Sequence, residues 1–230
     1  MSKSGRLATL GRRLLLPAGL VLAAVAALPI DCPLARWFAE GNCPGFLRDL
    51  LDTCEPFGRG WAAVLVVLVI HQLDPARRWA LPRVLACPLL SGLAADGIKM
   101  LIERARPRSF ECGGDVWTTF GSWFPLGSAG SAGQSFPSGH AAVAVGLAMA
   151  LIWLYPRGRR LFIALAVLVA CQRVASEAHY LSDVLCGGAV GYLAAMACLR
   201  SGWPSGWFDR WERRWQAAAA NKRDCKSAAR

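Results

Sequence analysis

Six apolar stretches separated by short polar segments dominate the pattern of this 230-residue chain. Runs that approach the ~20 residues needed to cross a bilayer are typical of membrane helices. A single short run would also fit a buried helix of a soluble protein, but six runs with almost no internal charge favour spans. The pattern predicts an all-α, integral membrane six-helix bundle with helices at Leu14–Ile30, Phe57–Leu73, Val84–Ile102, His140–Tyr155, Leu161–Gln172 and Val184–Leu199.

This bundle is expected to form one domain over residues 1–202, with the candidate chemistry confined to residues 96–192. After the last span, tryptophan recurs at every fourth position, at Trp203, Trp207, Trp211 and Trp215, with arginines in between. Two interpretations fit: an amphipathic helix in the inner headgroup layer, or an aromatic belt that follows the last span. Residues 203–230 are assigned to a cytoplasmic amphipathic helix and basic tail.

The composition agrees with a membrane protein and leaves the net charge to be explained. Apolar residues make up 55% of the chain and charged residues 18%, which excludes disorder over most of its length. The formal net charge is +11. Such an excess indicates nucleic-acid binding in a soluble protein but cytoplasmic loops in an apolar one. The position of the charges distinguishes the two.

Basic residues concentrate on one side of the predicted bundle. With the N-terminus in the cytoplasm, the inner segments 1–13, 74–83, 156–160 and 200–230 contain 18 of the 26 lysines and arginines. Because cytoplasmic loops of membrane proteins are enriched in these residues, both termini are predicted to be cytoplasmic, in a bacterial-type inner membrane. The charge then reflects topology, and nucleic acid is not an expected partner.

Two features outside the spans stay open. The first apolar run follows basic residues and contains Ala24-Val25-Ala26, which also resembles the cleavage site of a secretory signal peptide. On the predicted outer side lie Cys32, Cys43, Cys54 and Cys112, where one or two disulfides are plausible without a predictable pairing. No cysteines or histidines have zinc-ligand spacing, so no metal site is predicted.

Three polar clusters fall on the predicted outer side, beside or within the spans. They are Lys99-x6-Arg106-Pro107, Pro137-Ser138-Gly139-His140 and Arg173-x5-His179-x3-Asp183. Polar residues in such places are costly and indicate function by default. Lysine and arginine can hold phosphate oxygens, and a Ser-Gly pair before a helix offers backbone N–H groups to an anion. Of two histidines, one can attack phosphorus and the other can protonate the leaving oxygen. The clusters therefore predict phosphoryl transfer.

Each cluster also has an ordinary structural interpretation. Lys99 and Arg106 can extend to the interface as snorkelling side chains, and Ser138 can simply cap a helix. His179 and Asp183 are four residues apart, so the carboxylate can reach the imidazole in a contact that stabilises a helix. Asp96 lies three residues before Lys99, so a neutralising pair is expected there. Gly187 and Gly191 are expected to let the sixth span pack closely. Chance occurrence of all three clusters in order is improbable, which favours the functional interpretation.

The three clusters resemble the signatures of the type 2 phosphatidic acid phosphatase and vanadium haloperoxidase superfamily. That resemblance covers about Asp96–Tyr192, with one departure: Gln172 stands where the family usually has serine. It implies a metal-independent phosphatase without a cofactor, in which His179 forms a phosphohistidine, Asp183 orients it and His140 protonates the leaving oxygen. The phosphoryl oxygens would be held by Lys99, Arg106, Ser138, Gly139 and Arg173.

The expected substrate is a lipid phosphate or diphosphate at the outer membrane surface. Undecaprenyl diphosphate, phosphatidate, phosphatidylglycerol phosphate and lipid A phosphate are the candidates, with a preference for an isoprenyl diphosphate or a phospholipid phosphate. The alternatives are a vanadate-dependent haloperoxidase, and a non-enzymatic lipid-binding or transport protein of the same fold. The sequence makes no prediction about the oligomeric state.

Overall fold

A computed structural model describes residues 3–110, 113, 115–126, 128, 130–200 and 205–228, without the side chains of residues 3–10, 12 and 218–228. Eight α-helices lie in this part of the chain: α1 (Lys3–Ala39), α2 (Gly45–Cys54), α3 (Gly60–Leu73), α4 (Leu81–Lys99), α5 (Gly139–Leu154), α6 (Arg159–Ala175), α7 (Leu181–Leu199) and α8 (Ser205–Ala228). The 3-10 turns are η1 (Glu55–Gly58), η2 (Pro75–Ala80), η3 (Pro107–Ser109), η4 (Val116–Thr119) and η5 (Pro156–Gly158). Two short strands, β1 (Ile102–Arg104) and β2 (Phe120–Trp123), pair antiparallel.

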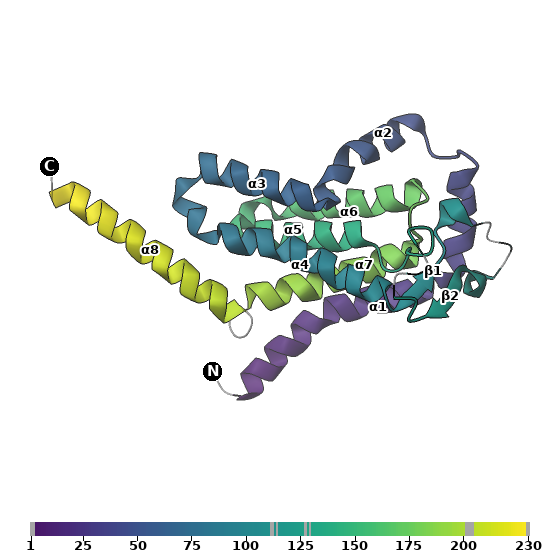
Figure 1. The fold of residues 1–230 in the computed structure, drawn as a ribbon, viewed down its shortest axis with the longest axis horizontal. Helices are drawn as coiled ribbons and strands as arrows, with labels where there is room; N and C mark the ends of the chain where they lie inside the picture. Colours follow the sequence, from purple (N-terminus) through teal and green to yellow (C-terminus); the bar gives the residue numbers. More distant parts are fainter. Residues whose placement is uncertain are drawn as a thin grey trace.

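The predicted six-helix bundle is confirmed, because every apolar stretch forms the body of a helix: α1, α3, α4, α5, α6 and α7. These helices run side by side along the long axis, with the β-hairpin and α2 at one end (Figure 1). The N-terminus and α8 lie toward the opposite end. Helix α2 and the hairpin were not predicted, because their short polar segments have no apolar periodicity.

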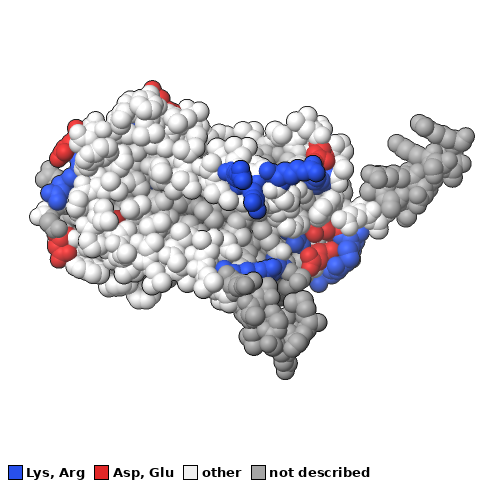
Figure 2. Space-filling view, turned by 180° about the vertical axis from the view of Figure 1, so that it is seen from behind, with Lys and Arg blue, Asp and Glu red and all other residues white. Residues whose placement is uncertain are grey.

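The protein is a multi-pass membrane protein. By length and composition, three helical segments can each cross a membrane: Arg13–Ala39, Pro75–Lys99 and Leu181–Leu199. Gly45–Gly58 and Gly60–Leu73 together would form a fourth span, bent by 74°. In Figure 2, few charged atoms lie over the middle of the visible face, and most of those that can be seen lie toward its two ends. Such an uncharged belt suits a helical bundle in a bilayer.

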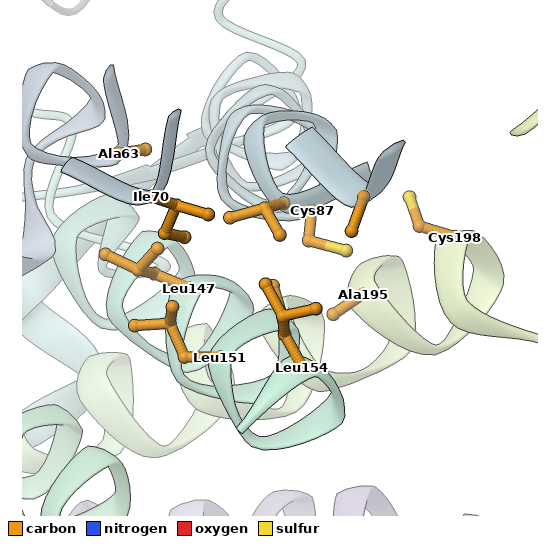
Figure 3. Packing of buried hydrophobic residues seen from close by; sticks show 11 residues of the cluster. Ala63, Ile70, Cys87, Leu147, Leu151, Leu154, Ala195 and Cys198 are labelled. Carbon is orange, nitrogen blue, oxygen red and sulfur yellow. The ribbon is translucent and has the colours of Figure 1, made fainter. Parts of the chain in front are cut away.

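The half of the bundle away from the β-hairpin is held by apolar packing. Leu147 and Leu151 of α5, Val84 and Cys87 of α4 and Ala195 of α7 belong to one buried cluster, most of which Figure 3 shows. Leu147, Val84, Cys87 and Ala195 have no exposed surface. Since lipid tails are as apolar as these side chains, close packing contributes more here than exclusion of water.

Two glycines allow α7 to lie against the start of α5, as the sequence predicted. A Cβ at Gly187 would stand 2.3 Å from the carbonyl oxygen of Ser138, and one at Gly191 would stand 2.3 Å from that of Ala142. Both distances are far below any real Cβ contact. This approach brings the first turn of α7 directly beside the first turn of α5.

At the end of the bundle opposite the β-hairpin, α8 is attached to α4 by one buried arginine. Arg83 is 3% exposed and pairs with Asp209 at 2.6 Å and with Glu212 at 2.8 Å. Its guanidinium also lies over the rings of Trp153 and Phe208. The start of α8 is therefore fixed to the bundle. Trp203, the first tryptophan of the repeat, lies outside the described residues.

One of the four cysteines considered for disulfides is oxidised. Cys32 takes part in a disulfide bond, whereas Cys43 and Cys54 are free thiols. Cys112 lies outside the described residues. One of the disulfides considered plausible from the sequence is therefore present.

Candidate active site

The three sequence clusters meet at one end of the bundle. Lys99 is the last residue of α4, and Arg106 follows β1. Ser138 caps α5, whose first two residues are Gly139 and His140. The third cluster spans the end of α6, the connection to α7 and the first turn of α7, at Arg173, His179 and Asp183.

Specific contacts connect the clusters to one another. A Cβ at Gly139 would stand 3.1 Å from the Nζ of Lys99, so the end of α4 lies against the start of α5. The backbone N–H of Ser138 donates to the carbonyl of Asp183 at 3.0 Å. Arg106 donates to the carbonyl of Ala178 at 3.4 Å. Residues from three regions of the sequence therefore surround one site.

The contacts of His179 determine which ring nitrogen is free. Its Nδ1 lies 2.7 Å from the backbone carbonyl oxygen of Ser135. A carbonyl oxygen only accepts hydrogen bonds, so Nδ1 carries the proton and Nε2 keeps its lone pair. Burial, and then the charges of Arg106 and Lys99, hold the pKa of His179 well below its ordinary value. The side chain is therefore a neutral imidazole with an available nucleophilic nitrogen.

The direct bond expected from Asp183 to His179 is not made. The carboxylate oxygen lies 3.9 Å from Nδ1, beyond hydrogen-bonding distance. Instead, the Ser135 hydroxyl donates to Asp183 at 2.6 Å, while the Ser135 carbonyl accepts from His179. Asp183 also accepts from the backbone N–H of Tyr180 at 2.9 Å. It thus contacts the histidine through Ser135, and its orienting role stays a prediction.

Behind Asp183 lies a buried ionic network that the sequence did not reveal. Arg104 of β1 is fully buried and pairs with Asp183 and with Asp31 of α1, the latter at 2.8 Å. Asp31 accepts from the backbone N–H of Ser182 at 3.0 Å, and Arg104 donates to the hydroxyl of Thr119 at 3.1 Å. The one local signal of this network in the sequence is Asp31, an acidic residue at the end of the first apolar run. Acidic residues in such positions indicate function.

The cations of the site are held in different ways. Lys99 pairs with Asp96 at 3.0 Å, as predicted. Arg106 donates from Nε to the carbonyl of Ser131 at 2.7 Å and from Nη2 to that of Gln134 at 3.3 Å. Each terminal nitrogen of a guanidinium carries two protons. Arg106 therefore retains donors for an anion while it is clamped to the loop.

Arg173 is fixed by a side chain that departs from the family pattern. Its Nε donates to Gln172 at 2.6 Å, and Gln172 donates to Asp52 of α2 at 2.7 Å. Its Nη2 lies 2.8 Å from Glu55, which also lies 3.5 Å from Nε2 of His140. Sequence analysis singled out neither Asp52 nor Glu55, because nothing in their local pattern distinguishes them from solvated surface acids.

The bundle contains an apolar groove of about 1100 Å³. Helices α1, α2, α5, α6 and α7 line it. Its walls include Ala141, Val174 and Val184, which directly follow His140, Arg173 and Asp183 in the sequence. Helices that carry the site therefore also line the groove.

The described residues can serve phosphoryl transfer with protein cations alone. Among them, no group of three His, Cys, Asp or Glu residues is arranged to hold a metal ion. Lys99, Arg106 and Arg173 all act electrostatically on His179. Fixed positive charges of this kind can stabilise the transferred phosphoryl group.

Comparison with known proteins identifies a family. The profile of the PAP2 superfamily matches residues 80–207, more than half of the chain. A lipid A 1-phosphatase of Rhizobium etli (strain ATCC 51251 / DSM 11541 / JCM 21823 / NBRC 15573 / CFN 42) is 36% identical over 184 residues, 73% of this chain and 75% of that protein. A lipid A 1-phosphatase of Rhizobium johnstonii (strain DSM 114642 / LMG 32736 / 3841) is 42% identical over 103 residues, 45% of this chain and 40% of that protein.

A solved structure has a similar fold. The crystal structure of a transmembrane PAP2-type phosphatidylglycerolphosphate phosphatase from Bacillus subtilis matches with a TM-score of 0.50 and 18% sequence identity. The match covers 79% of this chain and 92% of that one. At this identity the likeness concerns the fold, and it agrees with the helical membrane bundle described above.

Proposed function

The chain belongs to the PAP2 superfamily and is a membrane lipid phosphatase, and from this premise we propose that it removes the 1-phosphate of a lipid A-type glycolipid. Two relatives carry the name lipid A 1-phosphatase, one of them 36% identical over 73% of this chain. This substrate replaces the isoprenyl diphosphate or phospholipid phosphate that sequence alone favoured. Lipid A phosphate was among the candidates.

One observation carries the proposal: a neutral imidazole stands beside protein cations in a bundle whose helices also line an apolar groove. The free Nε2 of His179 supplies a nucleophile, and Lys99, Arg106 and Arg173 supply charge that a phosphate can bind. The groove supplies room for acyl chains. A soluble phosphate ester would need no such groove.

In the first step, Nε2 of His179 attacks phosphorus and the bond from phosphorus to the glycosidic oxygen breaks. His140 donates a proton to that oxygen, so that the lipid leaves as an alcohol. Lys99, Arg106, Arg173, Ser138 and the backbone N–H of Gly139 bind the phosphoryl oxygens as they develop charge. Ser135 holds the Nδ1 proton of His179 throughout, with Asp183 behind it.

In the second step, water cleaves the phosphohistidine. His140, now neutral, takes a proton from the water as its oxygen attacks phosphorus. The bond between phosphorus and Nε2 breaks, inorganic phosphate leaves, and His179 is again neutral. Each residue returns to its starting protonation state, so no metal or redox partner is required.

The proposed location is the inner membrane, with the active site on the periplasmic face. This rests on the excess of basic residues in the inner segments. The same topology places both termini in the cytoplasm, with residues 203–230 following the domain of residues 1–202. Trp207, Trp211 and Trp215 of α8 are partly exposed, with Trp207 stacked on Trp211 and Trp215 tilted against Trp211, which suits contact with headgroups at the inner surface.

The other functions considered are not favoured. A vanadate-dependent haloperoxidase would use a similar anion site, but the relatives reported above are phosphatases. A non-enzymatic lipid-binding protein would have no need of an unprotonated histidine nitrogen held beside three cations.

Phosphate release from a panel of lipids tests the proposal. Purified protein in detergent, with excess EDTA, is offered lipid A, phosphatidate, phosphatidylglycerol phosphate and undecaprenyl diphosphate. We expect release from lipid A with specific loss of the 1-phosphate, read by mass spectrometry. The matched control is His179→Ala, which removes the proposed nucleophile.

Two results would overturn parts of this proposal. Preference for another lipid on the panel would reject lipid A as the substrate and keep the phosphatase. Equal release by wild type and His179→Ala would reject the nucleophile.

A further inference from the structure

A carboxylate lies inside the cationic site, where the phosphate-binding pattern gives no reason for one. Glu55, the first residue of η1, lies 2.8 Å from Arg173 and 3.5 Å from Nε2 of His140. Arg59 also donates to both of its oxygens at 2.9 Å. The Glu55 side chain is only 15% exposed. A negative charge beside a phosphate site weakens anion binding, so Glu55 must contribute something other than phosphate binding.

The turn that carries Glu55 is seated directly on the start of α5. A Cβ at Gly58, the last residue of η1, would stand 2.9 Å from the carbonyl oxygen of His140 and 2.6 Å from Val169 of α6. This tight packing fixes the turn against both helices that carry the site. The position of Glu55 is thus part of the fold rather than a surface rotamer.

The charges around His140 show what the carboxylate can do there. Arg173, Arg59 and Lys99 all face this ring with positive charge, and Glu55 faces it with negative charge. Burial and three cations favour the neutral ring, which carries a proton on only one of its two nitrogens. A carboxylate at Nε2 favours the charged ring.

We propose that Glu55 is a positioning residue that holds the imidazolium of His140 through Nε2 and fixes Arg173 beside it. This rests on the proposed function above. Because Nε2 faces Glu55, the proton given to the leaving oxygen comes from Nδ1. The ring is then neutral and keeps its Nε2 proton, which faces Glu55, and Nδ1 takes a proton from the attacking water in the second step.

A second contact shows that the same segment holds Arg173 from another side. Asp52 of α2 accepts from Gln172, whose carbonyl oxygen accepts from Nε of Arg173. Asp52 and Glu55 lie three residues apart. Glu55 pairs with Nη2 of Arg173, whereas Asp52 acts on Nε of Arg173 through Gln172. The glutamine that departs from the family pattern is therefore the connection between α2 and the site.

The test separates proton donation from structure by changing the leaving group. Glu55→Gln keeps an acceptor for Arg173 but removes the charge. A lipid phosphate with an alcohol leaving group needs protonation, whereas p-nitrophenyl phosphate, with a stable phenolate, needs little. We expect kcat on the lipid to fall by about 10²-fold, a typical contribution of a general acid, with little change on p-nitrophenyl phosphate.

Two further readouts sharpen this test. KM for the lipid should stay the same or fall in Glu55→Gln, because a charge that repels phosphate is gone. The basic limb of the kcat profile should move to lower pH, since the ring loses its proton more easily. Glu55→Asp should recover part of the kcat. The control Asp49→Asn removes an exposed charge from the same segment and should change none of these values.

Each possible failure has a distinct meaning. Equal losses on both substrates would show that Glu55 only maintains the fold of the site, and no loss on either would show that it has no role. Either result overturns the inference while the phosphatase stands. A wild-type protein that releases phosphate from no lipid would instead overturn the proposed function.

Discussion

The two ends of the bundle are held together by opposite kinds of contact. Away from the site, Leu147, Val84 and Ala195 belong to one cluster of buried apolar side chains, part of which Figure 3 shows. At the end that carries the site, Arg104 and Asp183 are equally buried but form ion pairs and hydrogen bonds. The first kind tolerates shape-conserving changes, whereas the second depends on every partner being present.

The ion pairs lie at the end of the bundle that carries the active site, where the chemistry needs a fixed geometry. The network of Arg104, Asp31 and Asp183 joins β1, α1 and α7 behind the Ser135–His179 contact. A buried pair is weak evidence for stability, but loss of one partner leaves an uncompensated charge. The ionic end therefore fixes geometry, while the apolar end supplies the bulk of the packing.

The largest effect on stability is expected from Arg104→Met. The change leaves Asp31 and Asp183 buried without their cation, which should lower the free energy of unfolding by about 3–5 kcal/mol. Unfolding in mixed micelles, followed by circular dichroism, measures it. Adding Asp31→Asn to the same protein removes one orphaned charge and should recover part of the loss. Strict additivity of the two changes would contradict the electrostatic explanation.

A smaller effect is expected at the apolar end from Leu147→Ala. The change opens a cavity between α4 and α5 and should cost about 2 kcal/mol, the lower part of the range for buried leucines. The loss is limited because the bilayer supplies little hydrophobic driving force. Leu193→Ala, at a partly exposed site, is the matched control. Turnover by folded Leu147→Ala should match wild type, and a large fall in kcat would contradict the separation of the two ends.

The smallest effect is expected from a substitution in the wall of the apolar groove. Ala170→Trp places a large ring among its walls. KM for a long-chain lipid phosphate should rise severalfold, with no change for a short-chain analogue. Ala164→Trp, on the exposed side of the same helix, is the control. Equal effects on both chain lengths would show that acyl chains do not use the groove.

The apolar end could be predicted from sequence because its signals are local. Each span appears as one continuous run, and the close packing of Gly187 and Gly191 follows from their spacing within a single helix. The three clusters were also predicted to lie on one side, since charge counting orders the loops. The structure brings their backbones together at one end of the bundle.

The ionic end could not be predicted, because its contacts join distant residues without a local pattern. Arg104 lies 73 residues from Asp31, and Gln172 lies 120 residues from Asp52. Nothing near Glu55 distinguishes it from an exposed acid such as Asp49. The expected bond from Asp183 to His179 also failed for this reason, because Ser135 enters between them from a loop 44 residues before the histidine.

The central claim is that His179 attacks phosphorus, and trapping the covalent intermediate tests it most directly. Wild-type protein is mixed with a lipid phosphate labelled with ³²P on phosphorus, quenched in alkaline denaturant within the first turnover and separated by electrophoresis. We expect label on the protein that is stable to base and lost in acid, as phosphohistidine is, and that maps to the peptide containing His179. Label that persists in His179→Ala, or turnover that never labels the wild-type protein, would contradict the claim.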